Sequence, residues 1–291
     1  MYPSAFEYSA PASFAEAVAC LGELGPEAKV LAGGCSLIPL MKLRLAEPTH
    51  LVDIGRVPDA AYLRDVDGEL RIGALTREAD VERSLLVAAR YPILADASAV
   101  IADPSVRNMG TLGGNLAHGD PANDHPAVML AMRATIVALG PKCERTIPAD
   151  DFFVDLFQTA LEPGEVLTEI RIPAPPAGSG SGYVKFERQV GDFAIAAAAA
   201  AVRLENGRIA EASIALTNAG PTVVRASAAE ATLTGRVPDD ASLRDAAAAA
   251  RDEAAPWADL RGSTEMKQRL AGVAVERALR LAIRRAQEGR A

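Results

Sequence analysis

The stretch KVLAGGCSLIPL, residues 29–40, decides how the first part of the chain folds. Its opening residues, KVLAG, have the pattern of a short buried strand, and the helical pattern of PLMKLRL follows. Gly33 and Gly34 lie between the two, and glycine allows both unusual backbone angles and the close approach of another group. With HLVDI at 50–54 as the next strand, the pattern predicts a β-α-β unit that closes near residue 55.

A second glycine turn, TLGGN at 111–115, lies inside IADPSVRNMGTLGGNLAHGDPANDHPA, residues 101–127. Each turn offers consecutive backbone N–H groups beside a hydroxyl, Ser36 in one and Thr111 in the other, and this chemistry suits a pyrophosphate. Neither turn matches the G-x-G-x-x-G of a dinucleotide-binding unit or the G-x-x-x-x-G-K-[ST] of a P-loop. A single Gly-Gly pair is more often a plain strand-to-helix turn, so the phosphate-binding hypothesis depends on there being two.

Charge and cysteine content exclude several classes of function. The 291 residues carry 30 Lys and Arg against 38 Asp and Glu, a net charge of −8, without a basic block that would bind nucleic acid. The three cysteines form no C-x-x-C pair, which argues against a disulfide framework and against an iron–sulfur site. The N-terminus lacks a signal-peptide pattern, and no run approaches the ~20 apolar residues of a membrane span. We therefore expect a cytoplasmic protein.

Cap and turn signals predict the elements around the glycine turns. Ser13 and Glu16 form a capping box that begins a helix over 14–24. Asp67-Gly68 predicts a hairpin between two strands. One continuous helix is predicted from Thr76 to the residue before Pro92.

A change of composition at PAPPAGSGSG, residues 173–182, predicts a linker and a domain boundary near residue 177. In FAIAAAAAAV the alanines favour a helix, but Asn206-Gly207 is a strong hairpin signal and RIAEASIAL alternates with period two, so we predict two strands. Trp257 is expected to be packed. Helices are predicted over 264–287 and within 245–255, and the predicted domains are 1–55, 56–176 and 177–291.

Three segments carry a resemblance to a known family: AGGCSLIPLMKLRL at 32–45, the phrase over 101–127, and KFERQVGDFAIAAAA at 185–199. In this order and spacing they resemble the medium, FAD-binding subunit of the molybdenum hydroxylases, the xanthine dehydrogenase family, and within it the carbon monoxide dehydrogenases. The resemblance implies an α+β (mixed α/β) fold. It would consist of an FAD-binding type 2 region, of the vanillyl-alcohol-oxidase (PCMH-like) kind, in two subdomains, followed by a C-terminal three-stranded sheet with helices.

The same resemblance implies which residues hold the cofactor. The two glycine turns would wrap the FAD pyrophosphate, Asp124 would contact FAD, and Lys185 would lie near the flavin. Ile101 and Ala102 would line the cleft, and the backbone of Leu167 would contact the adenine end. The implied FAD-binding residues are Val30, Leu31, Ala32, Gly33, Gly34, Cys35, Ser36, Leu37, Ile101, Ala102, Thr111, Leu112, Gly113, Gly114, Asn115, Asp124, Leu167 and Lys185. No residue of this chain is assigned a catalytic or metal-binding role.

Two positions depart from the family pattern. The residue between Gly34 and Ser36 is usually glutamine in the family and histidine in the carbon monoxide enzymes, but here it is Cys35, a shorter side chain and a weaker hydrogen-bond partner. Phe193 stands where the carbon monoxide enzymes have a tyrosine. Both departures weaken the case for carbon monoxide as the substrate. Cys35 has no evident partner base and is expected to make a passive contact.

The resemblance implies an electron-transfer flavoprotein subunit that acts as an oxidoreductase only within a complex. Its expected partners are a large molybdopterin subunit and a small subunit with [2Fe–2S] clusters, arranged as a dimer of heterotrimers, and any membrane association would occur through them. Two alternatives stay open: a non-catalytic assembly subunit of the same fold, and a stand-alone flavin oxidase of the vanillyl-alcohol-oxidase type. His118 and His125 match no metal-ligand spacing and are expected to cap a loop.

Overall fold

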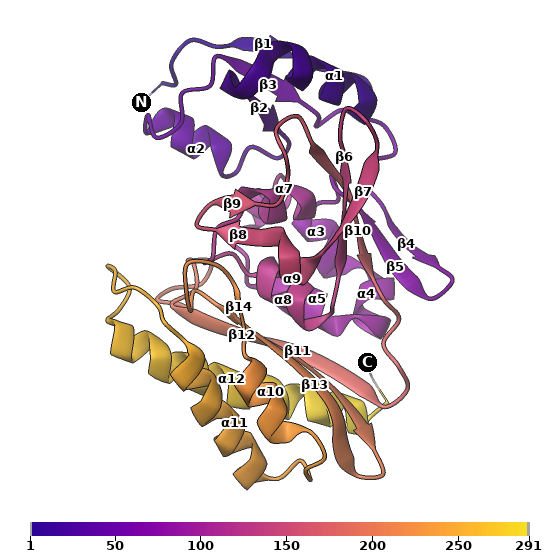
Figure 1. Ribbon diagram of the computed structural model, residues 1–291, viewed down its shortest axis with the longest axis vertical. Helices are drawn as coiled ribbons and strands as arrows, with labels where there is room; N and C mark the ends of the chain where they lie inside the picture. Colours follow the sequence, from indigo (N-terminus) through magenta and orange to yellow (C-terminus); the bar gives the residue numbers. More distant parts are fainter. Residues whose placement is uncertain (1, 290–291) are drawn as a thin grey trace.

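The computed structural model describes residues 2–289 and stacks three main sheets, each with its own helices, along the long axis of the molecule (Figure 1). The N-terminal sheet lies at the top of the view, a five-stranded sheet in the middle, and a four-stranded sheet below it. This arrangement confirms the predicted α+β fold class. Within residues 2–289, no helix is long and apolar enough to cross a membrane.

The N-terminal sheet confirms the predicted β-α-β unit. Its parallel strands have the order β1 (Glu7–Ser9), β3 (His50–Asp53), β2 (Ala28–Leu31), and α2 (Leu37–Lys42) connects β2 to β3. The predicted helix is α1 (Phe14–Leu24), which continues into η1 (Gly25–Glu27). The Ser13 hydroxyl accepts the Glu16 amide, but the Glu16 carboxylate accepts the Ala12 amide instead of that of Ser13, so only half of the capping box forms.

The middle sheet is antiparallel. Helices cover one side of it, and one of these helices, α7 (Leu112–His118), begins with the second glycine turn. The strand order is β4 (Leu63–Val66), β5 (Glu69–Gly73), β10 (Val166–Ile172), β6 (Thr135–Leu139), β7 (Glu144–Pro148). Asp67 and Gly68 form the predicted turn, with φ of 54° and 89°. The other elements of this region are α3 (Glu78–Arg83), α4 (Leu85–Arg90), α5 (Pro92–Ala99), α6 (Pro104–Arg107), α7 (Leu112–His118), α8 (His125–Ala131), α9 (Ala149–Phe152), β8 (Phe153–Asp155) and β9 (Gln158–Thr159).

The single helix predicted from Thr76 to the residue before Pro92 is wrong. The backbone of Ser84 is extended, with ψ of 121°, and it separates α3 from α4. The Ser84 hydroxyl accepts the Val87 amide and so caps α4. Serine competes with the helix by offering this local hydrogen bond, which a periodicity argument does not register.

The C-terminal sheet is covered on both faces, which explains the alanine run in its central strand. Its order is β11 (Ser179–Phe186), β12 (Ala196–Glu205), β13 (Arg208–Thr217) and the two-residue β14 (Val224–Arg225), so a short fourth strand joins the three expected ones. Along β12, Ala196, Ala198 and Ala200 lie in the core formed with the C-terminal helices, whereas Ala197 and Ala199 lie in the middle core. Small side chains on both faces let helices approach from both sides, and this packing overrides the helix propensity of alanine.

The helices α10 (Ser227–Leu233) and α12 (Thr264–Gln287) cover the outer face of this sheet, and α11 (Asp240–Glu253) packs on both of them. The predicted helices over 264–287 and within the alanine-rich segment both form, and α12 packs across β11 and β12 (Figure 1). Asn206 and Gly207 form the predicted hairpin turn, with φ of 51° and 73°. The expectation for Trp257 is wrong, since it is 55% exposed on the segment between α11 and α12.

The predicted linker over 173–182 is wrong in its second half, because Ser179–Gly182 belong to β11. A Cβ on Gly180 would lie 2.1 Å from the Ala282 carbonyl oxygen and 2.4 Å from the Ala286 amide nitrogen. The glycine is therefore required where the backbone of α12 lies directly on the strand, not for flexibility. Composition alone does not distinguish a flexible glycine from one in close contact.

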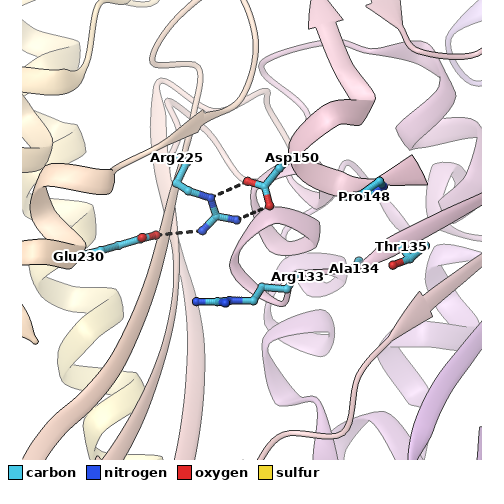
Figure 2. Close-up of a pocket in the computed structure, with 7 residues that line it drawn as sticks. All are labelled: Arg133, Ala134, Thr135, Pro148, Asp150, Arg225 and Glu230. Carbon is cyan, nitrogen blue, oxygen red and sulfur yellow. Dashed lines mark hydrogen bonds and ion pairs between the residues drawn. The ribbon is translucent and has the colours of Figure 1, made fainter. Parts of the chain in front are cut away.

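Arg225 fastens the C-terminal sheet to the middle region across a crevice (Figure 2). Its guanidinium pairs with the Asp150 carboxylate, Nε to Oδ1 at 2.6 Å and Nη2 to Oδ2 at 3.1 Å, and Nη2 also donates to the Leu130 carbonyl. On its own side of the crevice, Nη1 donates to Glu230 at 2.9 Å. Because a two-bond guanidinium–carboxylate pair is strongly directional, it restricts how the two regions can tilt.

Gly180→Val should destabilise the C-terminal region, because the added side chain would overlap the backbone of α12. Overpacking of this kind costs about 1–3 kcal/mol. Gly22→Ala is the matched control, since a Cβ there meets nothing within 4 Å. Thermal unfolding of the two purified variants measures the difference. Equal melting temperatures would mean that α12 can shift away without cost.

Candidate functional site

The fold brings the two glycine turns into direct contact, although they are far apart in the sequence. A Cβ on Gly33 would lie 2.2 Å from the Met109 carbonyl oxygen, so the first turn touches the backbone just before the second. A Cβ on Gly114 would lie 3.8 Å from that of Ala32. The two turns, which were expected to share a ligand, therefore lie next to each other where the N-terminal and middle regions meet.

The first turn presents a row of backbone donors. Within residues 2–289, the amides of Gly33, Gly34, Cys35 and Ser36 donate to no protein acceptor. Gly34 has φ of 75°, a left-handed conformation that glycine adopts without steric cost. Successive free amides around such a residue form a concave site for an anion. This part of the expected site has the chemistry that a diphosphate requires.

The second turn offers fewer free amides than expected: within residues 2–289, only the amide of Thr111 has no protein acceptor. TLGGN is the start of α7, with Thr111 as its N-cap. The amide of Leu112 donates to Thr76, that of Gly113 to Ala74, and that of Gly114 to the Thr111 hydroxyl. A Cβ on Gly113 would lie 2.6 Å from the Ala74 carbonyl oxygen, so this glycine allows close packing of α7.

Asn115 supplies a polar group that lacks a protein partner. Its side-chain Oδ1 is buried and accepts no hydrogen bond within residues 2–289, while its backbone carbonyl accepts from Asn123. A buried amide group without a partner is costly and is most often satisfied by water or a ligand. The unpartnered side-chain oxygen of Asn115 can accept a hydrogen bond, and the free backbone N–H groups of the first turn can donate them. Together they fit a ligand such as FAD, which has many hydrogen-bonding atoms.

A buried ion pair connects the start of α8 to the C-terminal sheet. Asp124 accepts from Lys185 Nζ at 3.0 Å and from the Tyr183 hydroxyl at 2.6 Å, and the side chains of the pair are 7% and 2% exposed. Burial raises the pKa of Asp124, against the opposing effects of Lys185 and the Tyr183 hydrogen bond. Burial next to the Asp124 carboxylate likewise holds the pKa of Tyr183 well above its usual value.

Tyr183 was missed by sequence reasoning, although the signal existed. Side chains two residues apart on a strand point to the same face, so the assignment of Lys185 to a site on β11 also places Tyr183 there. Lys185 further donates to the Val100 carbonyl at 2.9 Å and lies 3.4 Å from Glu187. The expected cleft residues Ile101 and Ala102 follow directly after that carbonyl.

Some expected residues lie further from this place. Leu167 is buried in the core of the middle sheet, where its backbone pairs with Ala138. Val30 and Leu31 belong to β2 and pair with Val52 and Asp53 of β3. Val30 and Leu31 lead directly into the first turn, and the Leu31 side chain reaches it, since a Cβ on Gly34 would lie 3.3 Å from Leu31 Cδ1.

His125 does not cap a loop as expected. It is the first residue of α8, fully buried, with Nε2 2.6 Å from the Glu78 carboxylate and 3.4 Å from the Ser98 hydroxyl. His118 packs on Phe157 with ring centroids 5.2 Å apart. Within residues 2–289, no three His, Cys, Asp or Glu side chains gather in a way that could hold a metal ion.

The thiol of Cys35 lies at the contact between the turns. Its Sγ is 3.7 Å from the Gly33 carbonyl oxygen and 3.8 Å from that of Val106. Burial raises the pKa of the Cys35 thiol, with Arg77 opposing and Glu78 adding to the effect. A raised pKa keeps the thiol protonated at neutral pH, which is the opposite of what a nucleophile needs.

Comparisons with known proteins agree with this geometry. Residues 4–175 match the model of the FAD binding domain in molybdopterin dehydrogenase, and residues 181–282 match that of the CO dehydrogenase flavoprotein C-terminal domain. The carbon monoxide dehydrogenase medium chain of Hydrogenophaga pseudoflava is 47% identical over 97% of this chain and 98% of that protein. Subunit alpha of the 6-hydroxypseudooxynicotine dehydrogenase complex of Paenarthrobacter nicotinovorans is 38% identical over 99% of this chain and 97% of that protein.

The fold of a solved relative is also very similar. The structure of a Hydrogenophaga pseudoflava carbon monoxide dehydrogenase lacking the Mo-pyranopterin moiety contains a chain that superposes with a TM-score of 0.96. That chain is 49% identical, and the match covers 98% of this chain and 99% of that one. The likeness therefore extends over all three sheets.

Lys185→Met should lower the free energy of unfolding by about 3–5 kcal/mol, because it leaves the Asp124 carboxylate buried without its cation. The double variant Lys185→Met/Asp124→Asn should recover most of this loss. The pKa of Asp124 is raised in the folded state above its ordinary value of 3.8. The folded state therefore binds the proton first, and the penalty in Lys185→Met should shrink as the pH falls towards that raised pKa.

Urea unfolding of the single and double variants at several pH values measures both effects. A loss in Lys185→Met that the second substitution does not relieve, and that stays the same at every pH, would contradict the ion-pair interpretation.

Proposed function

Because the chain belongs to the family of medium, FAD-binding subunits of the molybdenum hydroxylases, we propose that it is the electron-transfer flavoprotein of a heteromeric molybdenum-dependent dehydrogenase. Its relatives are named as dehydrogenases, so its chemistry is that of an oxidoreductase. The observation that carries the proposal is the row of free amides from Gly33 to Ser36, held against the backbone at Met109.

The residues of this chain have separate tasks in holding FAD. The amides of the first turn bind the diphosphate, and the side chain of Asn115 completes the polar contacts around it. Ile101 and Ala102 line the cleft, and Lys185 holds a positive charge near the flavin. The backbone at Leu167 contacts the adenine end. Bound FAD supplies a redox group that can exchange electrons singly or in pairs.

Partner subunits must supply the remaining redox centres. The chain has three cysteines, whereas a [2Fe–2S] cluster takes four protein ligands. A small subunit therefore carries the [2Fe–2S] clusters and a large subunit carries the molybdopterin. Electrons pass from the substrate through these centres to this chain and on to an external acceptor. The assembly is a dimer of heterotrimers that works in the cytoplasm.

The two departures from the family pattern lie at positions assigned to the flavin; they set this chain apart from the carbon monoxide enzymes without identifying its substrate. Cys35 lies at the contact between the turns, and Phe193 is 46% exposed, with the Arg261 guanidinium 5.5 Å from its ring centroid. The substrate binds to the large subunit. Cys35 and Phe193 therefore change how the flavin is contacted or reached, and relatives with different substrates share this subunit.

Gly33→Ala should weaken FAD binding about tenfold or more, which corresponds to at least ~1.4 kcal/mol of binding free energy, and so lower the FAD content of the purified complex. The new Cβ would lie 2.2 Å from the Met109 carbonyl oxygen and must push the row of amides out of place. Flavin absorbance relative to protein absorbance measures the content, and Gly22→Ala is the matched control.

The outcome also separates the proposal from its alternatives. A correctly assembled wild-type complex without FAD would refute the proposed function. Full complex activity in a Gly33→Ala variant that has lost its FAD would favour the assembly subunit. Substrate oxidation by this chain alone would favour the stand-alone oxidase, which would need a catalytic base in the third region, where the sequence has no histidine.

A further inference from the structure

A short segment of the cleft, residues 100–102, has a strained backbone. Ala102 has φ of 44°, in the left-handed region that a residue with a Cβ seldom occupies. It stands directly before Asp103, the N-cap of α6. Strain of this kind persists only where the surroundings hold it, and it is concentrated at ligand-binding sites.

Cations hold all three carbonyl groups of this segment. Lys185 Nζ donates to the Val100 carbonyl at 2.9 Å. Arg107 Nη1 donates to the carbonyls of Ile101 at 3.0 Å and Ala102 at 3.2 Å. Charge-assisted hydrogen bonds are about twice as strong as neutral ones, so the segment is firmly held.

Arg107 is itself oriented by a carboxylate. Its Nε donates to Glu82 Oε2 at 2.9 Å, and the two side chains are 14% and 28% exposed. Glu82 belongs to α3 and Arg107 to α6, so the pair joins two helices of the middle region. The guanidinium cannot turn away from the carbonyls without breaking this pair.

The planar peptide bond then sets the direction of the neighbouring amides. In a trans peptide the N–H points opposite to the C=O, so carbonyls of Ile101 and Ala102 that face Arg107 direct the amides of Ala102 and Asp103 away from it. Within residues 2–289, neither amide has a protein acceptor. Two adjacent donors are therefore free for a ligand.

The helix that follows these donors, α6, contacts the first glycine turn. The carbonyl oxygen of Val106, in α6, lies 3.8 Å from Cys35 Sγ of that turn. On the other side, Gly191 presses on the segment, since a Cβ there would lie 2.7 Å from the Ala102 carbonyl oxygen. The segment and α6 together thus lie between the first turn and the C-terminal region.

We propose that Arg107 is a positioning residue for FAD: it holds Ile101 and Ala102 in the strained conformation that directs the amides of Ala102 and Asp103 at acceptor atoms of the flavin. This inference rests on the proposed function, because it concerns the same cofactor. Arg107 acts through the backbone and does not touch FAD. A purely structural Arg107 would join α3 to α6 without any effect on the cofactor.

Arg107→Gln in the intact complex should weaken FAD binding about tenfold and make the flavin midpoint potential more negative, because donors that stabilise the electron-rich reduced ring are lost. Arg269→Gln is the control. It removes an exposed i,i+4 pair with Glu265 on α12, remote from the cleft. Reconstitution of the FAD-depleted complex gives the dissociation constant, and a spectroscopic redox titration gives the potential.

A second substitution tests the route through the backbone. Glycine adopts a positive φ without strain, so Ala102→Gly added to Arg107→Gln should restore FAD affinity and potential towards the wild-type values. The proposal is overturned if Arg107→Gln differs from the control only in melting temperature, or if the double variant is no better than Arg107→Gln. If the wild-type and control complexes bind no FAD, the proposed function fails instead.

Discussion

Direct contact between backbones, with no side chain between them, is the constraint on which the stacking of this molecule depends. It occurs where Gly33 meets Met109, where Gly113 meets Ala74, and where Gly180 meets α12. At each contact a single methyl group would overlap main-chain atoms that cannot move aside. The first contact holds the two glycine turns together, the second packs α7 on the residue after β5, and the third holds the last helix on its sheet. Of the three, the contact of Gly33 with Met109 brings the N-terminal and middle regions closer together than ordinary side chains allow.

Paired cations then determine how the layers are oriented at their seams. Lys185 joins β11 to Asp124 and to the cleft, and Arg225 joins β14 to Asp150. Arg107 performs the same task inside the middle region, between Glu82 and the carbonyls at 101 and 102. Buried ion pairs add little net stability compared with apolar packing, but breaking one is costly. Their contribution here is to fix the relative orientation of the elements that they join.

The sequence predicted those elements whose cause is local. Asn206-Gly207 and Asp67-Gly68 contain their own turn chemistry, and Ser13 supplies its own cap, so these positions were predicted correctly. The break at Ser84 is also local, but the apolar periodicity continues across it and predicts a single helix. The site residues came from a resemblance between whole segments, since neither glycine turn has a distinctive spacing.

The predictions that proved wrong concern residues whose contacts are made with segments distant in the sequence. The amides of TLGGN were expected to be free, but the strand end at Ala74 and Thr76 accepts two of them. Gly180 lies in a segment whose composition is that of a linker, but the residue is a packing site, because α12, near the C-terminal end of the chain, lies against it. Tyr183 was not predicted, and its hydrogen bond to Asp124 depends on the fold that brings β11 beside the start of α8.

The sequence by itself determined the turns, the caps, the alternation of the strands and the family, because each of these is carried by neighbouring residues or by the order of segments. Only the tertiary structure decided which amides remain free, which glycines are contacts and which cations hold the cleft. A hydrogen bond needs a donor and an acceptor. The sequence shows that a backbone N–H is present, but only the fold shows whether a distant carbonyl group accepts it.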